Sequence, residues 1–84
     1  MSALPMHTSL NEFDGFLSSV SNNIDIITVK VLDMNGRIAR RLSTDVSTGT
    51  HFLKSTLTDL STGIYVLNAF SGDMFLKAIK FIKA

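Results

Sequence analysis

The sequence contains no cysteine and no tryptophan, and it has one proline and one tyrosine in 84 residues. Without cysteine, the chain cannot form a disulfide, a thiolate metal site or a cysteine nucleophile. Its apolar stretches are interrupted by Lys, Asp or Thr every few residues, so no transmembrane helix of ~20 apolar residues fits. Eight basic and seven acidic side chains give a formal net charge of +1, and this balance gives no sign of nucleic-acid binding.

An apolar share of 45% excludes a disordered tail and is enough for one small domain with a single core. Without disulfides, that domain must rest on its core alone. Met1–Leu10 has neither a basic start nor an apolar run, so this segment is not a signal peptide. If the chain is exported, we expect it to be a fragment or its export address to lie elsewhere.

Three short segments rich in β-branched and aromatic residues predict strands. These segments are Ile24–Leu32, Ile64–Phe70 and Met74–Ile82. Apolar residues alternate with polar ones at Ile27, Val29 and Val31, as in a strand with one buried face. Turn-forming residues recur at spacings of about 10 residues, which favours an antiparallel sandwich or a small barrel.

Asp33-Met34-Asn35-Gly36 is the strongest turn signal in the chain. Gly36 can adopt a positive φ, and the Asp33 carboxylate can accept backbone N–H groups two residues on. A tight two-residue turn would set Lys30 opposite Arg41, which is an unfavourable pair of like charges. We therefore favour a type I turn closed by a glycine bulge, and we expect a second hairpin at Ser71-Gly72-Asp73.

Two segments are ambiguous between helix and strand. Ser9-Leu10-Asn11-Glu12 is a capping-box pattern that precedes apolar residues at helical spacing, but Gly15 weakens a helix, and Phe13–Ser19 can also be a strand. Leu53, Leu57 and Leu60 have helical spacing, although nearby β-branched threonines disfavour a helix. Ser43–Thr50 and Ser61–Gly63 are predicted loops. The predicted core comprises Ile27, Val29, Val31, Leu32, Ile38, Leu42, Leu57, Ile64, Val66, Leu67, Ile79 and Phe81.

The sequence offers no recognisable catalytic or metal-binding constellation. His7 and His51 have no carboxylate within four residues, and we expect them to be surface residues. Most carboxylates lie in turns, where they form turns and caps rather than acid–base pairs. We therefore predict that the chain is not an enzyme and has no cofactor or metal. The cluster Arg37, Arg40 and Arg41 is interpreted as a solvated edge strand whose charge blocks association between sheets.

Three segments in order resemble the type A sorting domains of proteins exported by the type IX secretion system of Bacteroidota. The segment Val29–Arg37 is similar to the family's V-x-V-x-D-x-x-G-R hairpin. Leu57–Leu67 is similar to its aspartate, leucine and G-x-Y strand, and Lys77–Lys83 to its closing lysine-and-aliphatic strand. The family usually begins with an apolar-Pro-Asn-Pro strand, whereas this chain has Leu4-Pro5-Met6.

The resemblance implies an all-β fold, an immunoglobulin-like antiparallel β-sandwich of about six to seven strands. Residues 13–84 would form the sorting-type domain, and residues 1–12 an N-terminal segment with a divergent or truncated first strand. The matched motif positions are Asp33, Gly36, Arg37, Gly63, Tyr65 and Lys77. We expect the Tyr65 ring to lie in the core, with its hydroxyl bonded at the rim.

The implied function is a non-catalytic sorting signal that directs a covalently continuous cargo domain across the periplasm and outer membrane, to the cell surface or beyond. The implied partners are the type IX translocon and a sortase-like cysteine protease, with no nucleic acid and no transmembrane segment. We hypothesise that the last hairpin, Tyr65–Lys83, is the recognised surface, and that an exposed edge strand permits a dimer. The alternative is an immunoglobulin- or fibronectin-like adhesion module, with carbohydrate as one conceivable ligand.

Overall fold

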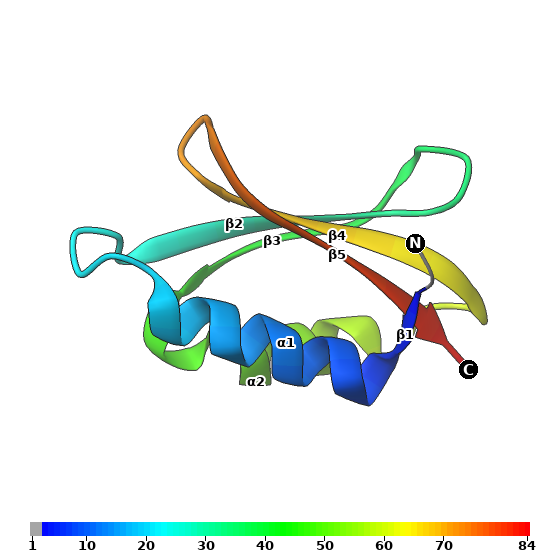
Figure 1. The fold of residues 1–84 in the computed structure, drawn as a ribbon. Coiled ribbons are helices and arrows are strands. Elements are labelled where there is room, and N and C mark those ends of the chain that lie inside the picture. Colours follow the sequence, from blue (N-terminus) through cyan, green and yellow to red (C-terminus); the bar gives the residue numbers. More distant parts are fainter. Residues whose placement is uncertain (1–2) are drawn as a thin grey trace.

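Strands are the predominant secondary structure of the computed structural model, which describes residues 3–84, and two helices lie together on one side of their sheet (Figure 1). The elements follow one another as β1 (Leu4–Pro5), α1 (Met6–Ser19), β2 (Ile26–Leu32), β3 (Ile38–Asp45), a 3-10 turn (Val46–Thr48), α2 (Gly49–Leu57), β4 (Gly63–Ser71) and β5 (Met74–Lys83).

The sheet has the strand order β1-β5-β4-β2-β3. All neighbouring strands are antiparallel except the short β1, which pairs in parallel with the end of β5, opposite Phe81 and Ile82. The long connection between β3 and β4 contains α2, and the helices pack against the face that buries Ile27, Val29 and Val31. We call the opposite side of the sheet the open face, because no described element covers it.

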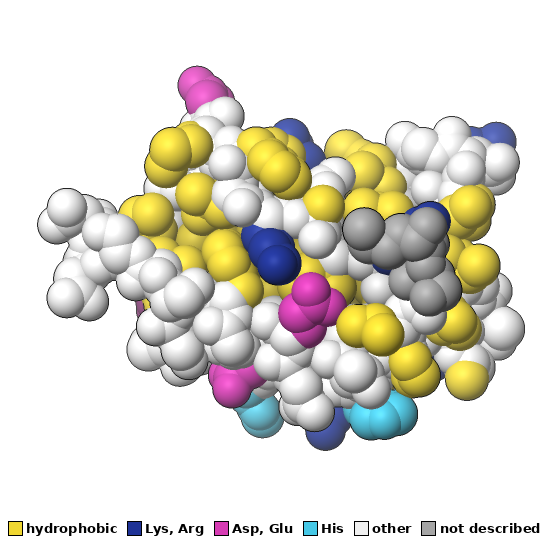
Figure 2. All heavy atoms as spheres, in the orientation of Figure 1, with side chains coloured by type: hydrophobic (Ala, Val, Ile, Leu, Met, Phe, Trp, Pro, Cys, Tyr) yellow, Lys and Arg dark blue, Asp and Glu magenta, His cyan; other side chains and the backbone are white. Residues whose placement is uncertain are grey.

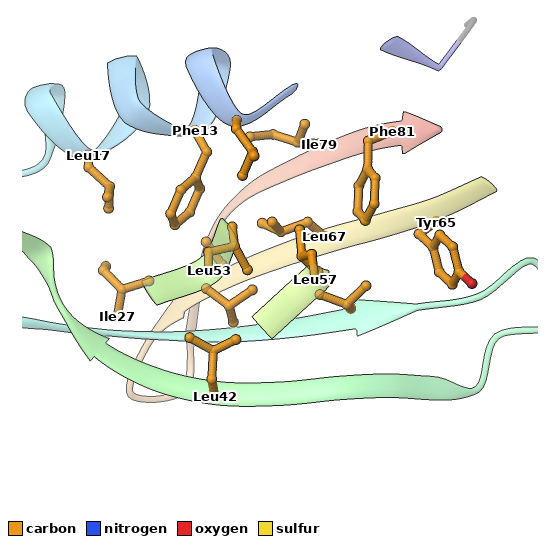
Figure 3. Packing of buried hydrophobic residues seen from close by; sticks show 14 of the residues in the cluster. Phe13, Leu17, Ile27, Leu42, Leu53, Leu57, Tyr65, Leu67, Ile79 and Phe81 are labelled. Carbon is orange, nitrogen blue, oxygen red and sulfur yellow. The ribbon is translucent and has the colours of Figure 1, made fainter. Parts of the chain in front are cut away.

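The core fills the space between the sheet and the helices (Figure 3). Phe13 and Leu17 point from α1 toward Leu53 of α2 and toward the buried side chains of the strands. Phe13 and Leu53 are fully buried. Helix and sheet therefore bury their apolar faces against one another, in the two-layer arrangement that a small domain requires.

The β2–β3 turn has the predicted geometry. The Gly36 N–H donates to the Asp33 carbonyl at 3.0 Å and the Asp33 N–H to the Arg37 carbonyl at 2.9 Å, while Gly36 has φ +82°. This is a type I turn with a glycine bulge, and it pairs Leu32 with Ile38.

The sequence did not predict a second irregularity, which lies in β3 next to this turn. Leu32 pairs with Ile38 but Val31 pairs with Arg40, so the register shifts between these two pairs. This shift places Lys30 opposite Arg41 after all. Solvent at the open face screens this pair of like charges, and the Lys30 Nζ lies 4.9 Å from the centre of the Phe70 ring, which attracts a cation.

Strands dominate the structure, as the predicted all-β fold requires, but the two helices and the count of five strands do not match an all-β sandwich of six to seven strands. Residues 3–84 form one five-stranded sheet, and α1 and α2 take the place of a second sheet. The strand alternative for Phe13–Ser19 was wrong, as was the loop over Ser43–Thr50, which comprises the end of β3, the 3-10 turn and the start of α2.

Burial of side chains explains why these two segments are helical. In α1, Leu10, Phe13 and Leu17 are buried and lie on one helical face. In α2, Leu53 and Leu57 are buried four residues apart. The Thr56 hydroxyl donates to the Phe52 carbonyl at 3.0 Å. Tertiary packing thus outweighs the modest helix propensity of threonine and glycine.

The structure also corrects the predicted core. Ile27, Val29, Val31, Leu42, Leu57, Leu67, Ile79 and Phe81 are buried as expected. Leu32, Ile38, Ile64 and Val66 are not, because strand alternation places them on the open face. Each strand buries only the face that packs against the helices, so residues of both parities along a strand cannot all be core residues.

Candidate recognition surface

Five of the six sequence-predicted motif residues lie at one end of the sheet. The β2–β3 turn (residues 33–37) follows Leu32, which pairs with Val66 near the start of β4. Gly63, at the start of β4, pairs with Lys83 at the end of β5. We call this region the turn end, comprising residues 33–37, 63–65 and 83–84. Lys77 lies further along β5, opposite Ala69, and is not part of it.

Asp33 and Gly36 hold the β2–β3 turn in place. One carboxylate oxygen of Asp33 accepts hydrogen bonds from the Asn35 N–H at 2.9 Å and from the Arg37 N–H at 3.0 Å. Gly36 has a left-handed backbone that residues with a Cβ adopt only at a cost. The motif residues of this turn therefore have a folding role that is independent of any partner.

Tyr65 anchors β4 at the turn end. Its ring is 7% exposed and stacks on Phe81 at 5.5 Å between ring centres, and its hydroxyl donates to the Ser61 carbonyl at 2.7 Å. The predicted buried ring with a bonded hydroxyl is thus confirmed. A Cβ at Gly63 would contact this ring at 3.7 Å, which is an ordinary distance, so space does not require glycine there.

Arg37 and Lys77 are the motif residues whose side chains are most accessible. Arg37 is exposed in the β2–β3 turn. The Lys77 Nζ lies 3.7 Å from a carboxylate oxygen of Glu12 in α1, and both side chains are about two-fifths exposed. An ion pair this exposed contributes little to folding, so these two side chains are available to another molecule.

The outer edge of β5 is a surface feature that the sequence motifs did not indicate. Strand β1 pairs only with Phe81 and Ile82, so Met74–Lys80 has no strand neighbour on that side within residues 3–84. Met74 and Phe75 are more than half exposed. Figure 2 shows hydrophobic side chains gathered on this side of the molecule, between the sheet and α1.

Catalytic chemistry finds no support in the geometry of the described residues. His7 and His51 are exposed on separate helices, as the sequence predicted. Among residues 3–84 no three His, Asp or Glu side chains lie close enough together to hold a metal ion. Neither described helix is long and apolar enough to cross a membrane. The exposed features are a turn, a strand edge and an uncovered sheet face, which are kinds of surface that proteins in general use to contact one another.

Comparison with known protein families shows which family the chain belongs to. The family described as the secretion system C-terminal sorting domain matches residues 13–84, and the chain belongs to this family. It is a sorting signal for type IX secretion, which takes proteins across the outer membrane to the cell surface or the extracellular space. Its family is non-catalytic, and nothing supports the adhesion alternative. Neither the curated proteins nor the solved structures gave a match.

Proposed function

We propose that the β4–β5 hairpin, residues 65–83, is the surface that the type IX translocon binds. The observation that carries this proposal is the outer edge of β5 from Met74 to Ile79, which has no strand partner within residues 3–84. At the next residue, the Lys80 carbonyl accepts a hydrogen bond from the Ser9 hydroxyl of α1 at 3.4 Å. The outward N–H and C=O groups of an edge strand can pair with a strand of another protein. Met74 and Phe75 lie on the same stretch of strand, where they would add apolar contact area to such pairing.

The domain acts in this proposal by being bound, and it performs no chemistry. A sortase-like cysteine protease would cut between the cargo and the domain after translocation. The sorting unit would be residues 13–84, and β1, in the preceding N-terminal segment of residues 1–12, would be a shortened counterpart of the family's first strand. The position of β1 supports this reading, because β1 adds to the sheet beside β5 although it contains Pro5.

We also propose that the motif residues fall into two groups. Asp33, Gly36 and Tyr65 would serve mainly the fold, since the turn and the core explain them. Arg37 and Lys77 would serve recognition, because their side chains are exposed and contribute little to folding. For Gly63, the fold leaves enough space for a side chain, so it gives no steric reason for a glycine at this position.

Removing β5 from a reporter fusion would not test this proposal, because Ile79 and Phe81 are core residues and their loss would unfold the domain. A sharper test places Ser at Phe75 in the hairpin and at Phe52 in α2, which are 55% and 50% exposed. In a bacterium with a type IX system, we expect Phe75→Ser to reduce export of the fusion and Phe52→Ser to leave it unchanged. Equal export by both variants would contradict the proposed surface.

The division of the motif is tested by measuring export and stability together. We expect Arg37→Ala and Lys77→Ala to lower export while the thermal midpoint stays near that of the parent. Tyr65→Phe removes one buried hydrogen bond and should lower the free energy of unfolding by about 1 kcal/mol. Its export should fall only as far as the fraction of folded protein falls. Normal export by both Arg37→Ala and Lys77→Ala would remove their proposed role.

The edge of β5 could also pair with a second copy of the chain, and we propose this as the basis of a dimer. Sedimentation over a range of concentrations measures it directly. Met74→Lys places a charge on the edge, which opposes strand pairing, and should shift the equilibrium toward monomer. A chain that is monomeric at every concentration contradicts the dimer but leaves the sorting function unaffected.

A further inference from the structure

The open face of the sheet combines exposed apolar side chains with positive charge. Strand alternation and register place Leu32, Ile38 and Val66 in one row across three strands. Ile64 and Ile82 form the adjacent row at the turn end. Ile38 is 53% exposed, and Ile64 and Ile82 are also exposed. Polar residues normally dominate the solvent side of such a sheet, so this apolar area is unusual.

Three cations lie among these apolar residues. Lys30 and Arg41 face one another across β2 and β3, and Lys80 of β5 pairs with Val66. The only carboxylate among the strand positions of this face is Asp45, opposite Ile26 at the end of the sheet away from the β2–β3 turn. Within residues 3–84 the ion pair found is Lys77 with Glu12, on the helix side. The positive charge of the open face is therefore not neutralised within the described chain.

A second copy of the chain is a poor occupant for this face. Two-fold packing of one open face on another would bring two sets of Lys30, Arg41 and Lys80 into a single interface, with one Asp45 from each copy. Charges that are buried without partners cost several kcal/mol each. An apolar surface bordered by carboxylates would instead contact the isoleucine and leucine rows and neutralise the cations.

We infer that the open face docks onto an apolar protein surface of the secretion machinery that is bordered by Asp or Glu side chains. This inference rests on the proposed function and extends it, because it adds a sheet face that includes β2 and β3, outside the β4–β5 hairpin. The charges of Lys30, Arg41 and Lys80 select the partner and orient it, and the apolar rows supply the contact area.

The most informative variant is Arg41→Glu. Arg41 is exposed and lies on β3, away from the hairpin, and Glu at this position would face Lys30 as an opposite charge across the strands. The fold should therefore be as stable as the parent or more so. Lys54→Glu on α2 is the matched control, because Lys54 is also exposed and its reversal changes the net charge by the same amount. Arg41→Lys keeps the charge.

The readout is the exported amount of a reporter fused to the chain, in a bacterium with a type IX system. We expect Arg41→Glu to lower export about tenfold, the effect of roughly 1.4 kcal/mol of docking energy, with Lys54→Glu and Arg41→Lys near the parent. A change of Asp or Glu to Lys in a translocon component that restores export of Arg41→Glu would identify the acidic partner.

Each other result overturns a defined part of the proposal. If the parent fusion is not exported, the proposed function itself fails. If the parent and Arg41→Glu are exported equally, the docking face is wrong while the sorting function stands. Equal losses for Arg41→Glu and Lys54→Glu would mean that net charge matters rather than this face. A dimer broken by Val66→Lys on the open face but not by Met74→Lys on the edge would make a second copy the occupant, and would contradict an acidic partner.

Discussion

The two faces of one sheet differ sharply in this domain, although the same strands supply both. The helix side buries Ile27, Val29 and Val31 of β2 completely, against α1 and α2. The alternate residues of β2, including Lys30 and Leu32, lie on the open face, where they are half-buried and accessible to solvent or to a partner. Neighbouring positions on one strand therefore serve stability and recognition separately. Substitutions at such neighbours should have very different consequences.

The largest contrast is expected for Val31→Asp and Leu32→Asp. Val31 is fully buried, and a carboxylate there loses its hydration without gaining a partner. We expect Val31→Asp to unfold a domain whose stability is ~5–15 kcal/mol. Leu32→Asp, one residue further on the open face, should retain a cooperative thermal transition monitored by circular dichroism. A Val31→Asp midpoint equal to that of the parent would refute the assignment of the two faces.

A second pair compares aromatic residues of β5. Phe81 is 1% exposed and Phe75 is 55% exposed. Truncation of a buried phenylalanine leaves a cavity, so Phe81→Ala should cost ~3–5 kcal/mol in urea unfolding. Phe75→Ala should cost no more than about 1 kcal/mol, since more than half of this side chain is exposed and its ring packs edge-on against the Phe70 ring. Similar costs at the two positions would mean that the open face is covered.

A smaller change in stability is expected for substitution of Gly36 in the β2–β3 turn, where the backbone conformation rather than the space for a side chain favours glycine. A Cβ at Gly36 would have no atom within 4 Å, so only its left-handed backbone opposes substitution. Gly36→Ala should then cost about 1 kcal/mol, the conformational penalty for an L-residue, measured by chemical denaturation. Gly15 in α1 also has open space around it but no positive φ, and Gly15→Ala should stabilise the helix slightly.

The smallest effect is expected for the ion pair between the two layers. Lys77 and Glu12 are about two-fifths exposed and 3.7 Å apart, so a double-mutant cycle with Lys77→Met and Glu12→Gln should give under about 1 kcal/mol of coupling. High salt should reduce the coupling further. A value well above this would mean that Lys77 serves the fold rather than recognition.

Local patterns in the sequence were sufficient for β2, β4 and β5 and for the turns that follow β2 and β4. The alternation from Ile27 to Val31 predicted β2 and its buried face, and Asp33 with Gly36 predicted the bulged turn. The buried ring and bonded hydroxyl of Tyr65 also followed from residue chemistry. These features depend on neighbours within a few positions, where hydrogen bonding and backbone sterics act directly.

The layer opposite the sheet could not be predicted in this way. Phe13 and Leu17, or Leu53 and Leu57, suit a helix by spacing, but glycine and threonine weaken that preference, and only the apolar surface of the sheet resolves it. The same dependence explains the misplaced core residues Ile64 and Val66, since whether a strand's second face is buried depends on what packs against it.

Some features of the candidate recognition surface could likewise be predicted from the sequence, and others could not. The motif residues were visible in the sequence because they form a recurring ordered set, but their separation into structural and accessible groups required contacts such as that of Tyr65 with Ser61. The unpaired edge of β5 and the basic open face were not visible at all. Strand order and register arise from pairing between distant segments, and these long-range contacts decide which backbone groups and charges remain exposed.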